Sequence, residues 1–291
     1  MHVLILGAGY SGTAIAQALA PAAQSVTGTT RSPDKLRALE AAGIEPLLFD
    51  GTTISAELAA AMGKATHLIQ SIAPGHEGDP MFRAGTPPLT DLLPKLEWVG
   101  YLSTVGVYGD HGGGWVTEET PIKPVSQRSK ERVEAENAWL DHGARQGIPV
   151  AVLRLAGIYG PGRNAFRNLA ESTARRVVKA NQVFNRIRVE DIGSAAAFLA
   201  SRGMGGVFNV TDDEPGPPQD VVAEAARLMG VEPPPEIPFE AADMSPMARS
   251  FYGENKRVSN QRLRQAGFDF AFPNYRVSLA QLWTSGIWRG E

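Results

Sequence analysis

The sequence contains no cysteine among its 291 residues. This absence excludes a disulfide framework and a thiolate metal site, and it fits a reducing compartment such as the cytoplasm. The five histidines show no spacing typical of a metal centre. We therefore expect a cytoplasmic protein that binds no metal.

Long apolar runs and clusters of basic residues are absent as well. The opening run 3-VLIL-6 is too short for the core of a signal peptide, and no apolar stretch has the length that crosses a bilayer. The net charge of -3 and the dispersed lysines and arginines provide no basic field for nucleic acid. The sequence predicts a small-molecule partner rather than a membrane or a nucleic acid.

What the chain does contain is an alternation of short β-branched runs and alanine-rich stretches, which is typical of βαβ units. Its apolar content of 43% is enough to bury a sizeable core. The expected strands are 2–6, 25–29, 44–49, 66–70, 97–103, 149–156 and 206–210. The expected helices are 11–20, 33–42, 55–62, 128–143, 163–172 and 190–202. This pattern predicts the α/β class with a Rossmann-type doubly wound parallel sheet.

The rhythm of strands and helices loosens after residue 156, where a loop rich in glycine and proline follows. We expect a dinucleotide-binding domain over residues 1–156 and a smaller C-terminal substrate lobe built from residues 157–189 and 211–291. Residues 190–210 are expected to return to the larger domain. The boundary is therefore predicted to cross the chain more than once.

A glycine pattern stands between the first strand and the first helix, in 2-HVLILGAGYSGTAIA-16. Gly7 permits a tight turn, Gly9 lets the backbone approach a pyrophosphate, and Gly12 lets the helix pack close to the strand. The helix start at Tyr10 and Ser11 supplies amide donors and the positive end of the helix dipole. This placement predicts dinucleotide binding, and the alternative is a tight turn that holds no ligand.

The end of the second strand indicates which dinucleotide binds. NAD requires a carboxylate there for its ribose hydroxyls, whereas 28-GTTRS-32 offers Thr30, Arg31 and Ser32. A cation and two hydroxyls suit a 2′-phosphate, so the sequence predicts NADP, with NAD as the alternative. Arg31 could instead be a solvated residue before the helix that Pro33 begins.

Two further polar residues follow predicted strands. Asp50 is a candidate acceptor for the adenine amino group, or a turn residue before Gly51. Ser71, in 70-QSIAP-74, is a candidate contact to the ribose and nicotinamide, with a structural role in the loop as the alternative.

A set of segments in a fixed order resembles the extended short-chain dehydrogenase/reductase family, which includes sugar-nucleotide epimerases and dehydratases. The segments are the glycine pattern, 102-LSTVGVYG-109, the helix with Lys130, 153-LRLAGIYGPGRN-164, 187-IRVEDIGSA-195, 207-VFNVTDDEP-215 and 255-NKRVSNQRL-263. Each segment alone is a modest signal, and their order over most of the chain makes the resemblance specific. A missing catalytic tyrosine indicates an atypical branch.

The resemblance implies roles for three residues. Thr104 takes the position of the hydroxyl that hydrogen-bonds the substrate oxygen, Lys130 that of the lysine that holds the nicotinamide ribose, and Ser126 that of the catalytic tyrosine. A serine hydroxyl is far less acidic than a phenol, whose reference pKa is about 10. Because general acid catalysis contributes about 100- to 10,000-fold, we expect the family reaction to be slowed rather than abolished.

Few residues could replace the missing acid. His111, in the loop 109-GDHGGG-114, titrates near neutrality and is a candidate, with an exposed loop histidine as the alternative. The literal Tyr-x-x-x-Lys at 252-YGENK-256 lies outside the expected place, and we interpret it as coincidence. Tyr252, Lys256 and Arg257 are nevertheless candidates to contact an anionic substrate group, or else form a solvated charged stretch.

Three functions stay open on this basis. The first is an NADP(H)-dependent oxidoreductase of the atypical extended type that acts on a small polar carbonyl or alcohol. The others are an enzyme like the nucleotide-sugar epimerases and dehydratases, and a non-catalytic NADP(H)-binding sensor. The resemblance also implies dimerisation through paired helices. The first of them carries Pro87 and Pro88, which a helix start tolerates, and Pro94, which shortens what remains, so both a monomer and a homodimer are possible.

Overall fold

The computed structural model describes residues 1–290 of the chain. The strands are β1 His2–Leu6, β2 Ser25–Thr30, β3 Glu45–Leu48, β4 His67–Gln70, β5 Trp98–Thr104, β6 Trp115–Val116, β7 Val150–Leu155, β8 Gly157–Tyr159, β9 Arg176–Val178, β10 Arg186–Arg188, β11 Gly206–Val210, β12 Glu236–Pro238 and β13 Arg257–Val258. The α-helices are α1 Tyr10–Leu19, α2 Leu36–Ala41, α3 Ala56–Met62, α4 Leu89–Leu92, α5 Gln127–Gln146, α6 Ala165–Ala170, α7 Val189–Ser201, α8 Pro218–Met229, α9 Pro246–Ser250, α10 Gln261–Gln265 and α11 Tyr275–Thr284.

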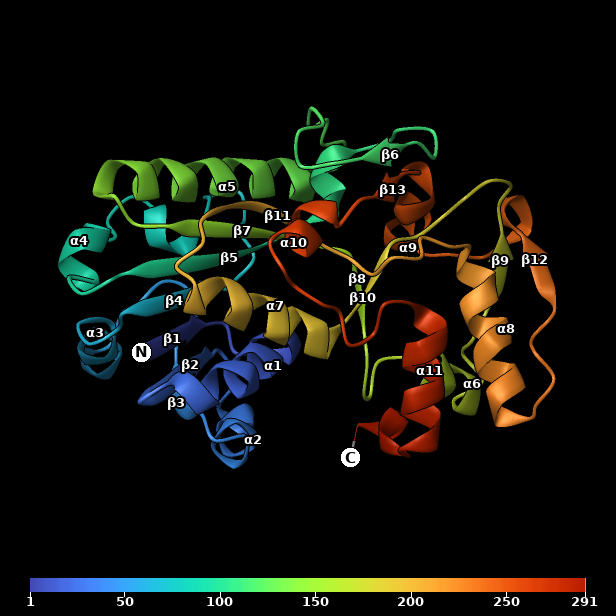
Figure 1. Cartoon of the computed structure of the whole chain (residues 1–291), viewed down its shortest axis with the longest axis horizontal. Coiled ribbons are helices and arrows are strands. Elements are labelled where there is room, and N and C mark those ends of the chain that lie inside the picture. Colours follow the sequence, from blue (N-terminus) through green and yellow to red (C-terminus); the bar gives the residue numbers. More distant parts are fainter. Residues whose placement is uncertain (291) are drawn as a thin grey trace. The chain divides into compact units, whose positions relative to one another are not determined.

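Seven strands form one parallel sheet in the order β11-β7-β5-β4-β1-β2-β3, which Figure 1 shows as a stack of arrows flanked by helices. β1 pairs with β2 on one side and with β4 on the other, so the chain reverses its direction of winding at β1. This is the doubly wound arrangement, and the predicted fold class is confirmed. In such sheets a ligand binds beyond the carboxyl ends of the strands at this reversal.

The predicted strands of the sheet lie within one residue of the observed ones. The predicted helices lie within two residues of the observed ones, except that α5 continues three residues beyond its predicted end and that one helix begins late. Residues 33–35 form a 3-10 turn, and α2 begins only after it. Pro33 has no amide hydrogen and a fixed φ, which allows it at the start of a helical segment, where short 3-10 turns are frequent. The predicted helix over 33–42 is therefore a 3-10 turn followed by a short α-helix.

The chain divides into two compact units. The first consists of residues 1–107, 124–154 and 192–208, and the second consists of residues 108–123, 155–191 and 209–291. The chain thus crosses between the units several times. The domain limits predicted from the sequence stay a prediction.

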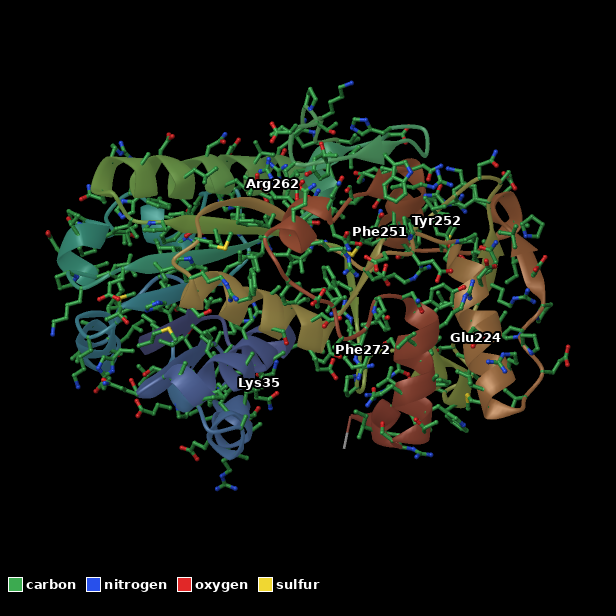
Figure 2. The ribbon with its side chains drawn as sticks, viewed as in Figure 1. Lys35, Glu224, Phe251, Tyr252, Arg262 and Phe272 are labelled. Atoms are coloured by element: carbon green, nitrogen blue, oxygen red, sulfur yellow. The ribbon has the colours of Figure 1, made fainter. Side chains whose placement is uncertain are left out.

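The second unit is built from short parallel strand pairs and helices. β8 pairs with β10, β9 with β12 and β6 with β13. Phe166 packs against Trp283 and Trp288, with ring centroids 5.3 and 6.1 Å apart, in a core shared by α6, α8 and α11. Both carboxylate oxygens of the buried Asp191 accept backbone amides, from Ala271 and from Phe272, which Figure 2 labels.

A buried ion pair attaches α5 to the sheet of the first unit. Glu136 on α5 accepts two bonds from Arg154 on β7, from Nε at 3.2 Å and from the terminal nitrogen at 2.7 Å. Glu136 also accepts the hydroxyl of Ser103 on β5. All three residues are buried, so this contact fixes α5 against two neighbouring strands.

Helices at the edge of the first unit are short. α4 spans only residues 89–92, ahead of Pro94, so the segment 86–96 does not form a long helix. The oligomeric state therefore stays open between a monomer and a homodimer. Within residues 1–290, no helix combines the length and apolar character needed to cross a membrane.

Replacing Arg154 with methionine should lower the free energy of unfolding by about 3–5 kcal/mol, because it leaves the carboxylate of Glu136 buried without its cation. The double variant Glu136→Leu/Arg154→Met should recover most of this loss, since no uncompensated charge remains. Chemical denaturation of both variants beside the wild type measures the difference. A double variant no more stable than Arg154→Met alone would contradict this account of the pair.

Candidate functional site

The turn after β1 has the geometry that a pyrophosphate requires. Gly7 adopts φ 88, a conformation that favours glycine, and its amide donates to the Thr29 hydroxyl at 2.9 Å. The amide of Gly9 donates to the Gly7 carbonyl at 2.8 Å, which closes the turn. α1 then begins with no side-chain cap at Gly9. Its first amides, those of Ser11 and Gly12 among them, are therefore without intrahelical acceptors.

The glycines of this turn differ in what surrounds them. A Cβ placed at Gly12 would lie 2.8 Å from the Gly7 carbonyl oxygen, so α1 packs too closely for any side chain there. A Cβ placed at Gly9 would meet no atom within 4 Å. The space above Gly9, beside the start of α1, is the cradle that a dinucleotide phosphate would enter. Tyr10, at the start of α1, is 37% exposed.

The end of β2 presents a cation. Arg31 is exposed, and it makes no hydrogen bond or ion pair that the structure records over residues 1–290. Thr30 is buried and its hydroxyl accepts the amide of Ser32 at 3.2 Å, which fixes the backbone on both sides of Arg31. The guanidinium is therefore available to an anionic group, and no carboxylate stands at this strand end.

Asp50 lies in the turn after β3 and is exposed. Its Oδ1 accepts the hydroxyl and the amide of Thr52 at 2.7 and 2.8 Å and the amide of Thr53 at 3.3 Å. The hydroxyl bond and the two amide bonds lower the pKa of this carboxyl. Oδ1 of Asp50 thus holds the turn, and its role toward adenine stays a prediction.

Ser71 directly follows β4 and is half-buried, with its amide bonded to the Leu6 carbonyl at the end of β1. The next residue, Ile72, donates its amide to the side chain of the buried Gln70. A Cβ placed at Gly7 would lie 3.0 Å from Ile72, so this loop borders the glycine turn. Ser71 is therefore held at the carboxyl edge where β1 and β4 meet.

Thr104 ends β5, and its hydroxyl oxygen accepts the amide of Gly106 at 3.1 Å. A Cβ placed at Gly106 would lie 3.0 Å from the hydroxyl of Ser129 and 3.3 Å from that of Thr104. Ser129, on α5, is buried, so it and Thr104 flank Gly106. Because Thr104 uses its oxygen as an acceptor here, its own hydroxyl proton stays available to a substrate oxygen.

Ser126 is the N-cap of α5. Its hydroxyl oxygen accepts the Ser129 amide at 3.2 Å and its proton goes to the Ser129 hydroxyl at 2.9 Å. Lys130, four residues further on, is exposed. The residue at the expected tyrosine position therefore caps a helix, which is a common role of serine.

Ser129 is not among the residues that the sequence predicts for the site, which in this segment are Ser126 and Lys130. The signal was present, because a serine followed three residues later by a second polar residue is typical of a helix start. What the pattern could not show is that the second serine turns toward Gly106.

The candidate acid His111 lies in the second unit. Its Nε2 is 3.1 Å from the Tyr108 carbonyl oxygen, and its amide donates to the Asn255 carbonyl. To donate this bond Nε2 carries the proton, and the neutral ring then keeps Nδ1 as its acceptor. The hydroxyl of Tyr108 is buried and donates to Asn209 at 2.7 Å, so this tyrosine supports the scaffold.

The residues predicted to bind substrate fall into different environments in the second unit. Lys256 is buried, and its ammonium donates to the Gly109 carbonyl and to Glu254. The ring of Tyr252 is largely buried between Phe184 and Phe239, whereas the neighbouring Phe251 is exposed; Figure 2 labels both residues. Arg257 lines a cavity of about 670 Å³ together with Gly112, Gly113, residues 178–183, Pro215, Pro217 and Gln219.

A buried acid of this unit escaped the sequence reasoning altogether. Asp212 is 1% exposed, and burial raises its pKa to about 8 although Arg186 acts against this shift. One carboxylate oxygen accepts the amide of Glu214, and the other has no hydrogen-bond partner. The sequence signal is a run of three acidic residues after β11, Asp212, Asp213 and Glu214, which by itself indicates a turn.

The first unit thus holds a phosphate-sized cradle, an available cation at the end of β2, and a hydroxyl with a proton to donate at the end of β5. These are the parts that a nicotinamide dinucleotide and a carbonyl oxygen would use. The cradle at Gly9 and the uncapped α1 fit the phosphates. The hydroxyl of Thr104 fits the orientation of a substrate oxygen.

Comparison with known proteins gives consistent matches. Residues 83–210 match the model of the NAD dependent epimerase/dehydratase family. A functionally unknown conserved protein from Silicibacter pomeroyi DSS is 45% identical, with 98% of each chain covered and a TM-score of 0.88. Protein YeeZ of Escherichia coli K12 is 28% identical over 281 residues, which is 94% of this chain and 96% of that protein. Human epimerase family protein SDR39U1 (isoform2), solved with NADPH, shares the fold at 18% identity, a TM-score of 0.73 and coverage of 98% and 99%.

Gly9→Ala should leave the free energy of unfolding within about 1 kcal/mol of the wild type, because its methyl group points into open space. It should nevertheless weaken dinucleotide binding at least tenfold, since the methyl group occupies the cradle. Gly12→Ala is the matched control, and it should destabilise the protein by about 1–3 kcal/mol through overpacking. Denaturation and calorimetric titration with NADPH separate the two effects, and full affinity in a folded Gly9→Ala variant would exclude this cradle as the phosphate site.

Proposed function

We propose that this chain is a member of the NAD-dependent epimerase/dehydratase family and an NADP(H)-dependent oxidoreductase that acts on a small polar carbonyl or alcohol. The observation that carries the proposal is the open cradle at Gly9 together with the available guanidinium of Arg31. A nicotinamide dinucleotide fits this arrangement because its phosphates need amide donors and its adenosine end needs a partner beyond β2.

The preference for NADP is inferred from the end of β2. Arg31 is exposed and forms no ion pair with a carboxylate of residues 1–290, so it can meet a 2′-phosphate with charge-assisted hydrogen bonds. NAD has a ribose 2′-hydroxyl in place of this phosphate, so the guanidinium would have no anionic partner. Solved proteins of the same fold hold either dinucleotide, NADPH in the human epimerase family protein and NAD in MoeE5, so the preference rests on Arg31.

The proposed chemistry is hydride transfer, which the nicotinamide supplies when it is bound. Thr104 would orient the substrate by donating its hydroxyl proton to the substrate oxygen. Lys130 would hold the nicotinamide ribose from the first turn of α5. Ser126 stands where the resemblance places the tyrosine, and its hydroxyl is used by the helix cap. The proton for the substrate oxygen would therefore come from water, and turnover would be slow compared with an enzyme that has the phenol.

A second candidate is a non-catalytic NADP(H)-binding sensor. The observation in its favour is the same cap at Ser126, because both hydrogen-bonding functions of its hydroxyl go to Ser129. A chain without an acid at this position could bind the dinucleotide and report its redox state without turnover. The oxidoreductase would turn over a substrate with bound NADPH, whereas the sensor would bind NADPH without turnover.

Arg31→Ala should weaken NADPH binding about 10- to 100-fold and leave NADH binding nearly unchanged, because a charge-assisted contact contributes about 1.5–3 kcal/mol. Arg227→Ala is the matched control, since Arg227 is an exposed arginine of α8 in the second unit that pairs only with its neighbour Glu224. Calorimetric titration with both dinucleotides provides the measurement. Equal losses for NADPH and NADH would contradict a role of Arg31 at the 2′-phosphate.

The wild type should oxidise NADPH slowly with at least one member of a panel of small polar aldehydes and ketones. Ser126→Tyr should raise this rate at least tenfold over Ser126→Phe, its size-matched control, because only the tyrosine supplies an acidic hydroxyl. Both variants lose the serine cap, so their stabilities should fall equally, by about 1 kcal/mol. Tight NADPH binding without turnover in the wild type and in both variants would favour the sensor over the enzyme.

A further inference from the structure

The first unit contains a second cavity, of about 460 Å³, that shares no residue with the proposed dinucleotide site. One wall is the segment before and within α4, and the other is the C-terminal part of α5. Its lining residues are Met81, Phe82, Arg83, Thr86, Pro87, Pro88, Leu89, Thr90, His142, Arg145 and Gln146. A cavity of this size accommodates a small organic molecule.

The titratable groups that line this cavity are all basic. Arg83 stands on one wall, and His142 and Arg145 stand on the other. One terminal nitrogen of Arg83 donates a hydrogen bond to the Gly51 carbonyl at 3.1 Å. Its buried Nε has no hydrogen-bond partner within residues 1–290 and forms an ion pair with Oε2 of Glu77 at 3.9 Å. The last carbonyls of α5 add a partial negative charge, which the full charge of Arg145 outweighs.

The aromatic wall of the cavity, formed by Phe82, is supported by buried residues that pack against it. The ring of Phe82 packs edge-on against Trp139 with centroids 4.7 Å apart, and His142 packs against both rings at 6.0 and 6.3 Å. The indole nitrogen of Trp139 donates to the buried Asp79, which also accepts the Met81 amide and the side-chain amide of Gln70. The wall is therefore formed before any ligand arrives, which reduces the entropy cost of binding.

His142 is the unusual member of this set. It is only 8% exposed, and the structure records no hydrogen bond to its ring. Burial is the main cause that lowers its pKa, and the positive charge of Arg145 lowers it further. The charge that acts on it is that of Arg145 on α5. Arg83 lines the opposite wall and pairs with Glu77, and Asp79 bonds to the indole of Trp139. A buried imidazole beside a cation and without an acidic partner lacks the anion that would stabilise its charged form.

We infer that this cavity binds a small organic anion, a carboxylate carried on an apolar body, with the carboxylate at Arg145 and His142 and the body against Phe82 and the prolines of the opposite wall. The cations supply charge-assisted hydrogen bonds, and the aromatic wall supplies burial of apolar surface. The bound anion raises the pKa of His142, so binding tightens as the pH falls from 8 to 6. This inference does not depend on the proposed oxidoreductase activity, because it uses none of the residues of that site.

The test is calorimetric titration of the whole chain with benzoate, and with benzyl alcohol and benzylammonium as neutral and cationic probes of similar size. Benzoate should bind at least tenfold more tightly than either, and its affinity should increase between pH 8 and pH 6. Arg145→Gln should weaken benzoate binding about tenfold, since it removes one charged contact at an exposed position where folding is not at risk. Arg227→Gln, at an exposed ion pair of the second unit, should change nothing.

Saturating NADPH should leave benzoate binding in place, which separates this cavity from the dinucleotide site. His142→Gln should remove the pH dependence while keeping part of the affinity. The inference is overturned if benzoate binds no better than benzyl alcohol, if Arg145→Gln binds it as the wild type does, or if NADPH displaces it. Each of these results would leave the oxidoreductase proposal untouched.

Discussion

The ion pair between Glu136 and Arg154 is the contact on which the arrangement of the first unit depends. It joins the long helix α5 to β7 and, through Ser103, to β5, inside a region from which water is excluded. Charges buried in this way are stable only when their partners meet in one geometry, so the pair fixes the position of α5 along the sheet. The start of that helix is thereby held beside Thr104, where the proposed chemistry takes place.

The opposite end of the proposed site is shaped by the absence of side chains. Glycine at residue 7 permits the turn and glycine at residue 12 permits close packing of α1, while glycine at residue 9 leaves a space that no residue of 1–290 fills. The buried ion pair of α5 and the glycines of the turn after β1 therefore have the same effect. Both hold binding groups in position before the ligand arrives.

The start of α5 shows how one residue can carry two interpretations. By its place in the sequence Ser126 stands for a missing catalytic tyrosine, and in the structure it caps a helix. Serine is a good cap and a poor proton donor, because its hydroxyl bonds well to amides and is far less acidic than a phenol. A chain that keeps the cofactor side of the site and has a cap at the acid position is therefore suited to slow redox chemistry or to binding.

The sequence by itself determined the parallel sheet, the limits of most strands and helices, and the glycine turn, because these follow from periodicity and backbone freedom within a few residues. The tertiary structure decided the partners of the charged side chains. Glu136 and Arg154 lie 18 residues apart and Lys256 and Gly109 lie 147 apart, and no local pattern reveals that such groups meet. Lys256, a predicted substrate contact, is buried and bonded to Gly109 and Glu254, whereas His142 lines a cavity that no sequence pattern predicts. Burial and long-range pairing arise only when the whole chain packs, and they decide which of the polar residues stay available to a ligand.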